Sequence, residues 1–173
     1  KEWYLAITLT TVDQPKNIEM AELIKKMWDQ IGVKTTLNIV EKEKIVQEAI
    51  NTRNYEALLF AENLGSDPDP FPFWHSSQGE YPGLNLAVFG NKTVDGLLEN
   101  ARKTNDFEER KKYYSDFQKI ISEELPAIFL FNPIYIYPQD KAVKGFNLSG
   151  ISVPSDRFIN LNEWYLKTKR IWK

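Results

Sequence analysis

The sequence predicts an α/β fold built on a sheet of parallel strands with helices between them. Strand-like and helix-like stretches alternate in the order β-α-β-α-β over residues 3–61, and this order favours parallel strands joined by right-handed crossovers. The third strand-like stretch, residues 55–61, is nearly continuously apolar, which is typical of a strand covered on both faces. The chain has 173 residues, 42% of them hydrophobic, and is therefore long enough to bury a good core.

The first two strands and the helix between them have clear signatures. Residues 3–11 are rich in aromatic and β-branched side chains, as strands are. Pro15 begins a helix and Gly32 ends it, and apolar side chains recur between them at helical spacing. Residues 33–39 alternate between apolar and polar side chains, which is the period of a second strand. The helix predicted next has an apolar face made of Ile45, Val46, Ala49 and Ile50.

A long loop, residues 62–91, follows the third predicted strand. Structureless loops beyond about 12–15 residues are usually functional or disordered. The first part of this loop, residues 62–77, carries three prolines together with Phe71, Phe73 and Trp74, a composition too aromatic for a disordered linker. It also follows the carboxyl end of a strand, where open α/β sheets bind their ligands. We therefore expect the loop to form the functional site.

Two helices are predicted after this loop. The first begins near Val94, and the second begins at Asp106, where a glutamate three residues later indicates a capped start. Pro126 ends the second helix. The apolar faces of the two helices consist of Val94, Leu97, Leu98 and Ala101 in the first and Tyr113, Tyr114, Phe117, Ile120 and Ile121 in the second.

The last part of the chain is harder to assign to regular elements. Residues 127–131 and 134–137 resemble strands, and Asn132-Pro133 interrupts them. From Pro138 onward the chain has turn residues and short apolar runs without a helical period. The chain begins at Lys1 without a starting Met, so we expect a fragment of a longer protein.

Composition excludes several classes of function. The net charge is −2, with 22 basic and 24 acidic residues well mixed, so no basic surface for nucleic acid is implied. There is no cysteine, which excludes disulfides, thiol catalysis and cysteine-based metal sites. No apolar run approaches the roughly 18–20 residues of a membrane span. We expect neither a bound metal nor a cofactor.

The polar residues of the loop have several interpretations. His75 is the only histidine, and the neighbouring Ser76 and Ser77 do not supply the geometry of a catalytic triad. Asp67 and Asp69 precede prolines, where aspartate commonly shapes a turn, although contact with a ligand, a metal or a sugar stays open. The aromatic group around Trp74 forms either a stacking platform for a ligand or an anchor that holds the loop on the domain.

Several segments, in their order and spacing, resemble the C-terminal part of an extracytoplasmic solute-binding protein of the peptide and nickel class, the family-5 binding proteins of ABC importers. The resemblance covers almost the whole chain. One of these segments, Ser66-Asp67-Pro68-Asp69-Pro70, matches the Asp-Pro loop of the family, and no single segment is specific by itself. The other parts are Met27 to Lys34, Asn54 to Ala57, Asn85 to Phe89, Asn91 to Leu98, Glu108 to Tyr114, Leu125 to Ile128 and Val143 to Phe146.

This resemblance implies one lobe of a type II periplasmic binding protein-like fold, an α/β lobe with a mixed, mostly parallel sheet flanked by helices, in a protein whose two lobes close on a ligand. Residues 1–133 would form the second lobe, and residues 134–173 would return toward an absent first lobe. The implied function is capture of an oligopeptide-like or other small solute, without a chemical reaction. The implied partners are the ligand, the membrane permease of the importer and the missing lobe. The implied location is the periplasm or the extracellular face of the membrane, and a lipid anchor on the full-length protein is left open.

Departures from the family pattern keep the ligand open. Peptide-binding members often carry an aspartate at the position of Leu64, where it pairs with the amino terminus of the peptide, and many have tryptophan at the position of Ala61. Glu62 could replace the missing charge, or the ligand could be a neutral oligosaccharide stacked on Trp74. A hydrolase that uses the carboxylates of Glu62, Asp67 or Asp69 is the alternative from another class. The expected ligand-binding residues are Glu62, Asn63, Leu64, Asp67, Trp74, His75 and Asn85.

Overall fold

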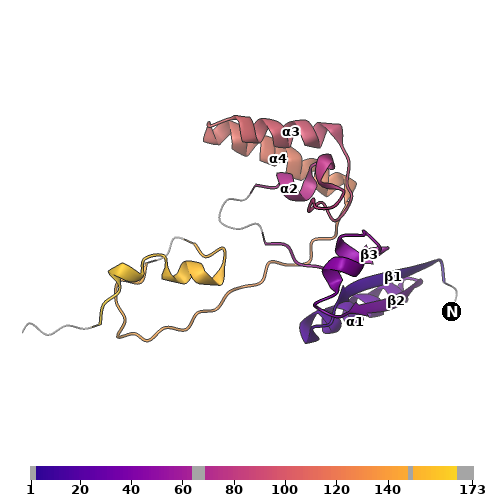
Figure 1. Ribbon diagram of the computed structural model, residues 1–173, viewed down its shortest axis with the longest axis horizontal. Helices are drawn as coiled ribbons and strands as arrows, with labels where there is room; N and C mark the ends of the chain where they lie inside the picture. The colour runs from indigo at the N-terminus through magenta and orange to yellow at the C-terminus, as the bar shows by residue number, and fades with distance from the viewer. Residues whose placement is uncertain (1–2, 64–68, 148–149, 167–173) are drawn as a thin grey trace, which may run out of the picture. The chain divides into compact units, whose positions relative to one another are not determined.

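The computed structural model describes residues 3–63, 69–147 and 150–166, and it begins with the predicted alternation of strands and helices. Strand β1 (Leu5–Val12) is followed by helix α1 (Pro15–Gln30) and strand β2 (Val33–Val40). The two strands pair in parallel from Leu5 opposite Val33 to Val12 opposite Val40 (Figure 1). Gly32, with a φ of 89°, turns the chain from α1 into β2 in the left-handed region that favours glycine. These elements confirm the α/β class and the parallel pairing.

The third strand is shorter than the sequence predicts. Strand β3 consists of Ala57–Leu58 alone and pairs in parallel with β1, so the strand order is β2-β1-β3. The prediction of a covered strand over residues 55–61 is wrong in extent, because β3 lies at the edge of the sheet and Phe60 is 41% exposed. Leu59 still packs inward, which accounts for part of the apolar pattern.

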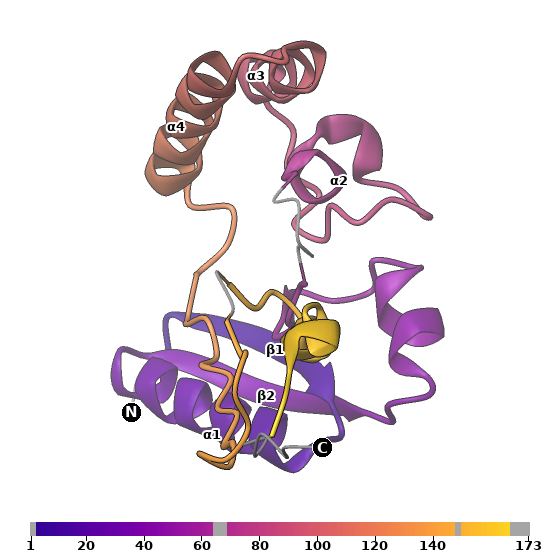
Figure 2. The ribbon, with the colours of Figure 1, turned by 90° about the vertical axis from the view of Figure 1, so that its left-hand side faces the viewer.

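Each face of the sheet has its own cluster of buried side chains. On one face, Leu9 and Leu59 pack with Ala21 of α1, which runs along the sheet (Figure 2). A second cluster joins Val12 and Val40 with the short helical turn η1 (Val46–Ile50). The predicted second helix is therefore a single turn of π-helix that covers the strands near their carboxyl ends.

Helices α3 (Lys92–Lys103) and α4 (Phe107–Glu124) form a hairpin with its own core (Figure 2). That core contains Val94, Leu98, Phe117 and Ile121, all from the two predicted apolar faces. The predicted cap is confirmed, since the Asp106 carboxylate accepts a hydrogen bond of 2.8 Å from the Glu109 N–H. Leu125, with a φ of 49°, takes the chain out of α4 before Pro126.

The stretches at residues 127–131 and 134–137 are not strands in the structure. The chain there is extended without ladder partners, and Ile128, Ile134 and Ile136 are 72%, 88% and 81% exposed. The sequence has strand propensity, but a strand also needs a neighbouring backbone, and the described chain supplies none there. Two 3₁₀ turns follow, η3 (Pro154–Phe158) and η4 (Leu161–Glu163), and Lys144 forms an isolated antiparallel bridge with Tyr165.

The chain divides into two compact units. The first consists of residues 1–62 and 70–127, and the second consists of residues 63–69 and 128–173. In the described ranges, none of the helices combines the length and the apolar character that crossing a membrane would require.

Candidate functional site

The predicted functional loop is partly ordered into short helices. Helix α2 (Phe71–Trp74) and the 3₁₀ turn η2 (Ser76–Gln78) lie within it, between β3 and α3. Pro72 occupies the first turn of α2, where a missing N–H costs nothing. Two of the expected ligand-binding residues, Leu64 and Asp67, lie outside the described residues. The other five are Glu62, Asn63, Trp74, His75 and Asn85.

His75 is buried at the junction of α2 and η2 and faces helix α3. Its Nδ1 accepts a hydrogen bond of 3.1 Å from the Ser77 N–H, so Nε2 carries the proton of the neutral ring. Among the residues that the structure describes, no group forms a hydrogen bond with that Nε2, which lies 3.5 Å from an oxygen of Glu99 and 3.8 Å from one of Asp95. His75 therefore ties the loop to α3. Nearby Lys103 and, to a lesser degree, His75 lower the pKa of Glu99.

The ring of His75 belongs to a three-layer stack. It lies against Phe71 with ring centroids 4.1 Å apart and planes inclined by 19°. The guanidinium of Arg102, from α3, lies 3.7 Å from the centroid of the same Phe71 ring. This arrangement holds α2 on α3 and leaves little of either ring for a ligand.

Asn85 is fully buried, and its side-chain amide is occupied by backbone groups of the same loop. Its Nδ2 donates to the carbonyl oxygens of His75, at 3.2 Å, and Phe89, at 2.8 Å. Its Oδ1 accepts from the Phe89 N–H at 3.1 Å. A buried amide with this many partners organises the loop, and contact with a ligand would require some of these bonds to break.

Trp74 packs on the α3–α4 core. Its ring meets Phe89 edge-on, with centroids 6.4 Å apart, and lies 6.3 Å from the ring of Phe117 in α4. Of the two interpretations left open by the sequence, these contacts favour the anchor over the stacking platform.

Glu62 and Asn63 differ from the other three residues, because both are exposed. They lie a few residues after the end of β3. Partial loss of hydration raises the pKa of the Glu62 carboxyl from its ordinary 4.5 to about 7. A cation close to this carboxyl would lower its pKa again, because it would stabilise the ionised form.

Arg53 connects the sheet to the functional loop, a role that the sequence did not reveal. Its guanidinium donates to the backbone carbonyls of Ile50, Gly79 (3.0 Å) and Gly83 (2.6 Å). The neighbouring Tyr55 hydroxyl donates to the Leu86 carbonyl at 2.6 Å. The sequence indicates only a turn at Arg53-Asn54, since the contacts to Gly79, Gly83 and Leu86 span 26 to 31 residues and leave no local pattern.

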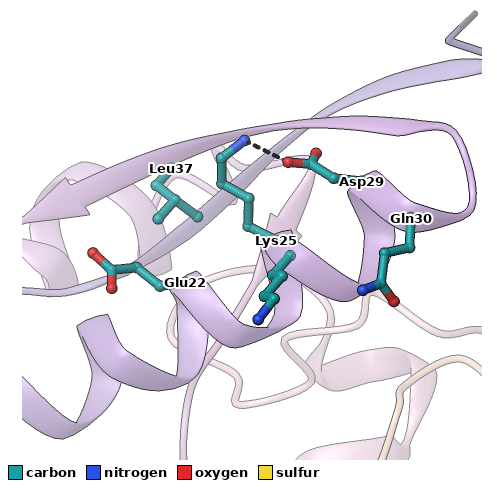
Figure 3. Close-up of a pocket in the computed structure, with 6 residues that line it drawn as sticks. Glu22, Lys25, Asp29, Gln30 and Leu37 are labelled. Carbon is teal, nitrogen blue, oxygen red and sulfur yellow. Dashed lines mark ion pairs between the residues drawn. The ribbon is translucent and has the colours of Figure 1, made fainter. Parts of the chain in front are cut away.

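In the described part of the first unit, two hollows lie away from the expected ligand-binding residues. One, of about 350 Å³, lies over the sheet and is lined by polar side chains of β1 and β2 and by residues 53–56. The other, of about 540 Å³, is an open groove between α1 and the outer edge of β2 (Figure 3). Within the described ranges, no three His, Asp or Glu side chains are placed to hold a metal ion.

Known proteins provide an independent comparison. No protein-family model matches the chain. The chain is 27% identical to the oligopeptide-binding protein AppA of Bacillus subtilis over 151 residues, which cover 86% of this chain and 26% of AppA. It is 31% identical over 143 residues to the peptide transport periplasmic protein SapA of Haemophilus influenzae, covering 80% of this chain and 25% of SapA. The chain thus spans about a quarter of the length of these curated relatives.

Solved structures extend the comparison. AppA from Bacillus subtilis in complex with a nonapeptide aligns with a TM-score of 0.71 at 25% identity, covering 94% of this chain and 32% of AppA. The periplasmic binding protein DppA from Helicobacter pylori, in complex with the peptide STSA, gives a TM-score of 0.72 at 23% identity. That alignment covers 95% of this chain and 31% of DppA, and at this identity it supports the fold alone.

Proposed function

We propose, on the premise that the chain belongs to the family-5 extracytoplasmic solute-binding proteins, that it forms part of the substrate-binding component of an ABC importer. The observation that carries the proposal is the similarity of most of the chain to AppA, whose structure holds a nonapeptide. The ligand class we propose is an oligopeptide or a similar small solute. The relatives are binding proteins, and binding without chemistry is the role that we propose here.

In this proposal the chain supplies one lobe of a two-lobe clamp. Residues 1–133 form the ligand-binding lobe, and residues 134–173 return toward a first lobe that the chain does not contain. The exposure of Ile134 and Ile136 supports this division, because apolar side chains of an extended segment gain stability when a further surface covers them. The membrane permease of the importer is the proposed partner, and the periplasm or the outer face of the membrane is the proposed location.

Glu62 is the proposed charged contact to the ligand. It follows β3, remains exposed, and has a raised pKa, so a ligand ammonium group would favour its ionised form. It would thereby take the role of the acidic residue that the family pattern has at the position of Leu64. Asn63 is exposed beside it and is the proposed neutral contact.

Calorimetry on the longer protein tests this contact. At a pH of about 6, binding of a peptide with a free amino terminus should release a proton, because Glu62 is largely protonated before binding and ionised afterwards. The heat of binding should therefore depend on the ionisation enthalpy of the buffer. Glu62→Gln should abolish that dependence, and an amino-terminally acetylated peptide should lack it. A buffer dependence that survives in Glu62→Gln would assign the proton to another group.

The clamp itself is tested by comparing the 173-residue chain with the longer protein. Each lobe supplies only part of the contact surface, and closure excludes water from the site. A peptide that saturates the longer protein should bind the 173-residue chain at least about a hundredfold more weakly, which corresponds to the loss of several contacts. Comparable affinities would contradict a two-lobe site. Mass spectrometry of ligand retained by the longer protein would identify the natural solute.

A further inference from the structure

His75, the only histidine of the chain, is buried with a ring nitrogen that points at two carboxylates of α3. Only 10% of its side chain is exposed, and in the described part of the chain its Nε2 has no hydrogen-bond partner. The carboxylate oxygens of Glu99 and Asp95 lie 3.5 Å and 3.8 Å from this Nε2. Good N–H···O hydrogen bonds are about 2.7–3.2 Å long, whereas the attraction between opposite charges acts over larger distances. The two carboxylates are therefore better placed to stabilise a charged ring than a neutral one.

Other contacts fix both carboxylates in position. One oxygen of Glu99 pairs with Lys103 at 3.2 Å, and its other oxygen faces His75. The two oxygens of Asp95 accept hydrogen bonds from the N–H and the hydroxyl of Ser76. Lys103 and, to a lesser degree, His75 lower the pKa of Glu99, so this carboxyl stays ionised over the pH range in which histidines titrate.

The remaining charged groups on the elements packed against the ring do not cancel these carboxylates. Arg102 opposes protonation of the ring, but Phe71 lies between the two groups in the stack. The charge of Lys103 is offset by the carboxylate with which it pairs. Helix α2 and the turn η2 carry no charged side chain, and the only charged residue among residues 79–91 is the exposed Glu80.

Ser77 is placed to hold the ring of His75 in both protonation states. In the neutral ring, Nδ1 accepts a hydrogen bond of 3.1 Å from the Ser77 N–H. The Ser77 hydroxyl oxygen lies 2.8 Å from the same nitrogen, and a hydroxyl can either donate or accept. When Nδ1 gains a proton, it can donate to this oxygen, and the Ser77 N–H loses its acceptor. The protonated ring then has a polar partner at each of its nitrogens.

We propose that His75, Asp95 and Glu99 form a proton-dependent latch, which fastens the loop of residues 75–89 to α3 more firmly when His75 is protonated. A histidine that binds a proton more tightly in the fastened loop than in a released loop stabilises the fastened state at low pH. That contribution is lost as the pH rises through the range in which histidine titrates. All residues of the latch belong to the first unit, so the latch depends neither on the proposed function nor on a ligand.

Amide hydrogen exchange of the 173-residue chain at about pH 5 and about pH 8 tests the latch, with each rate divided by that of an unstructured chain at the same pH. The amides of Asn85 and Phe89 are hydrogen-bonded within the loop. Relative to the amides of β1, they should be several-fold better protected at the lower pH. The Ser77 amide should change in the opposite direction, because protonation of Nδ1 removes its acceptor. A general gain in the stability of the first unit would not produce these opposite changes.

Two variants and a control identify the groups that act on the ring. The NMR signals of the His75 ring protons report its protonation directly, because the chain has no other histidine. Glu99→Gln removes the nearer carboxylate and should move this titration curve to lower pH by about one unit. Ser77→Ala keeps the N–H that holds the neutral ring but removes the oxygen that accepts from the protonated ring, so it should also move the curve to lower pH. Glu22→Gln removes an exposed carboxylate of α1 and should leave the curve in place.

Two results would overturn the proposal. The first is a His75 titration curve that neither Glu99→Gln nor Ser77→Ala moves. The second is protection of Asn85 and Phe89 that does not rise at the lower pH relative to β1. Glu99 and Ser77 are both exposed, so both variants should keep the fold. If a melting curve shows that one of them is unfolded, the other decides.

Discussion

The two units of the chain place similar side chains in different surroundings. In the unit formed by residues 1–62 and 70–127, apolar side chains gather in three buried clusters, two on the sheet and one between α3 and α4. The other unit has no buried residue among those described, although its sequence is rich in isoleucine, phenylalanine and tyrosine. Its most exposed members include Ile134 and Ile136, at 88% and 81%.

The difference shows that apolar content alone does not create a core. The first unit buries its apolar clusters because amphipathic helices and a sheet place apolar faces against one another. The second unit has extended chain and 3₁₀ turns, held by local contacts such as the packing of Trp164 on Phe146, with centroids 5.3 Å apart. Stability within this chain should therefore depend mainly on the first unit, and the predictions below test that contrast.

A matched pair of leucine substitutions provides the largest contrast. Leu98 in α3 is 1% exposed, whereas Leu161 in the second unit is 55% exposed. Leu98→Ala should lower the free energy of unfolding by about 2–5 kcal/mol, through lost burial and the cavity left behind. Leu161→Ala should change it by less than about 0.5 kcal/mol. Urea unfolding of both variants measures the difference, and equal effects would mean that the two units are equally important for stability.

Trp74→Ala tests whether the loop is part of the first unit or part of a ligand surface. The contacts of Trp74 with Phe89 and Phe117 predict a loss of about 3 kcal/mol of stability. Ligand affinity of the longer protein should change less than about tenfold, as measured by titration of the fraction that remains folded. A stable variant that has lost its affinity would instead establish Trp74 as a stacking platform.

Arg53 allows one part of the first unit to be tested separately, because its hydrogen bonds join the sheet to the loop before α3. Arg53→Met removes three hydrogen bonds from a charged group to the carbonyls of Ile50, Gly79 and Gly83, and should cost about 2 kcal/mol or more. Hydrogen exchange should accelerate in residues 79–86 more than in α3. Arg53→Lys is the control, since it keeps the charge but cannot reach three carbonyls in one plane. If hydrogen exchange accelerated equally across the whole first unit, then the hydrogen bonds of Arg53 would not stabilise residues 79–86 in particular.

The elements with a clear period were predictable from the sequence, and those that depend on distant partners were not. Helix α1, strand β2 and the α3–α4 pair follow local apolar spacing, and the structure places them within a few residues of the prediction. Strand propensity at residues 127–137 was misleading, because a ladder needs a second backbone. Strand β3 is shorter than predicted for the same reason: only Ala57 and Leu58 pair with the backbone of β1.

The packing inside the candidate site was not predictable from the sequence. Aromatic and proline content led us to expect the functional site in residues 62–91, and that expectation stays a prediction; the structure places Trp74 in α2 and His75 and Asn85 in the segments that follow. Their partners are separated from them in sequence, as with His75 and Glu99 or Trp74 and Phe117, so their internal roles could not be read from spacing. The sequence likewise gave no sign that Arg53 would hold three carbonyls, because a lone arginine in a turn is most often solvated.

Glu62, the last residue of the first unit, gives the smallest expected effect and a pH dependence of known sign. Its pKa is raised from 4.5 to about 7, so the folded chain favours the protonated carboxyl more than the unfolded chain does. The resulting stabilisation is fully present below pH 4.5 and is lost as the pH rises through about 7. In Glu62→Gln, the free energy of unfolding should vary less between these pH values than in the unaltered chain, by an amount kept small by the exposure of the residue. Urea unfolding at several pH values measures this. If the two curves stay parallel, then Glu62 is fully hydrated at the boundary between the units, and its proposed contact with a ligand ammonium loses its electrostatic basis.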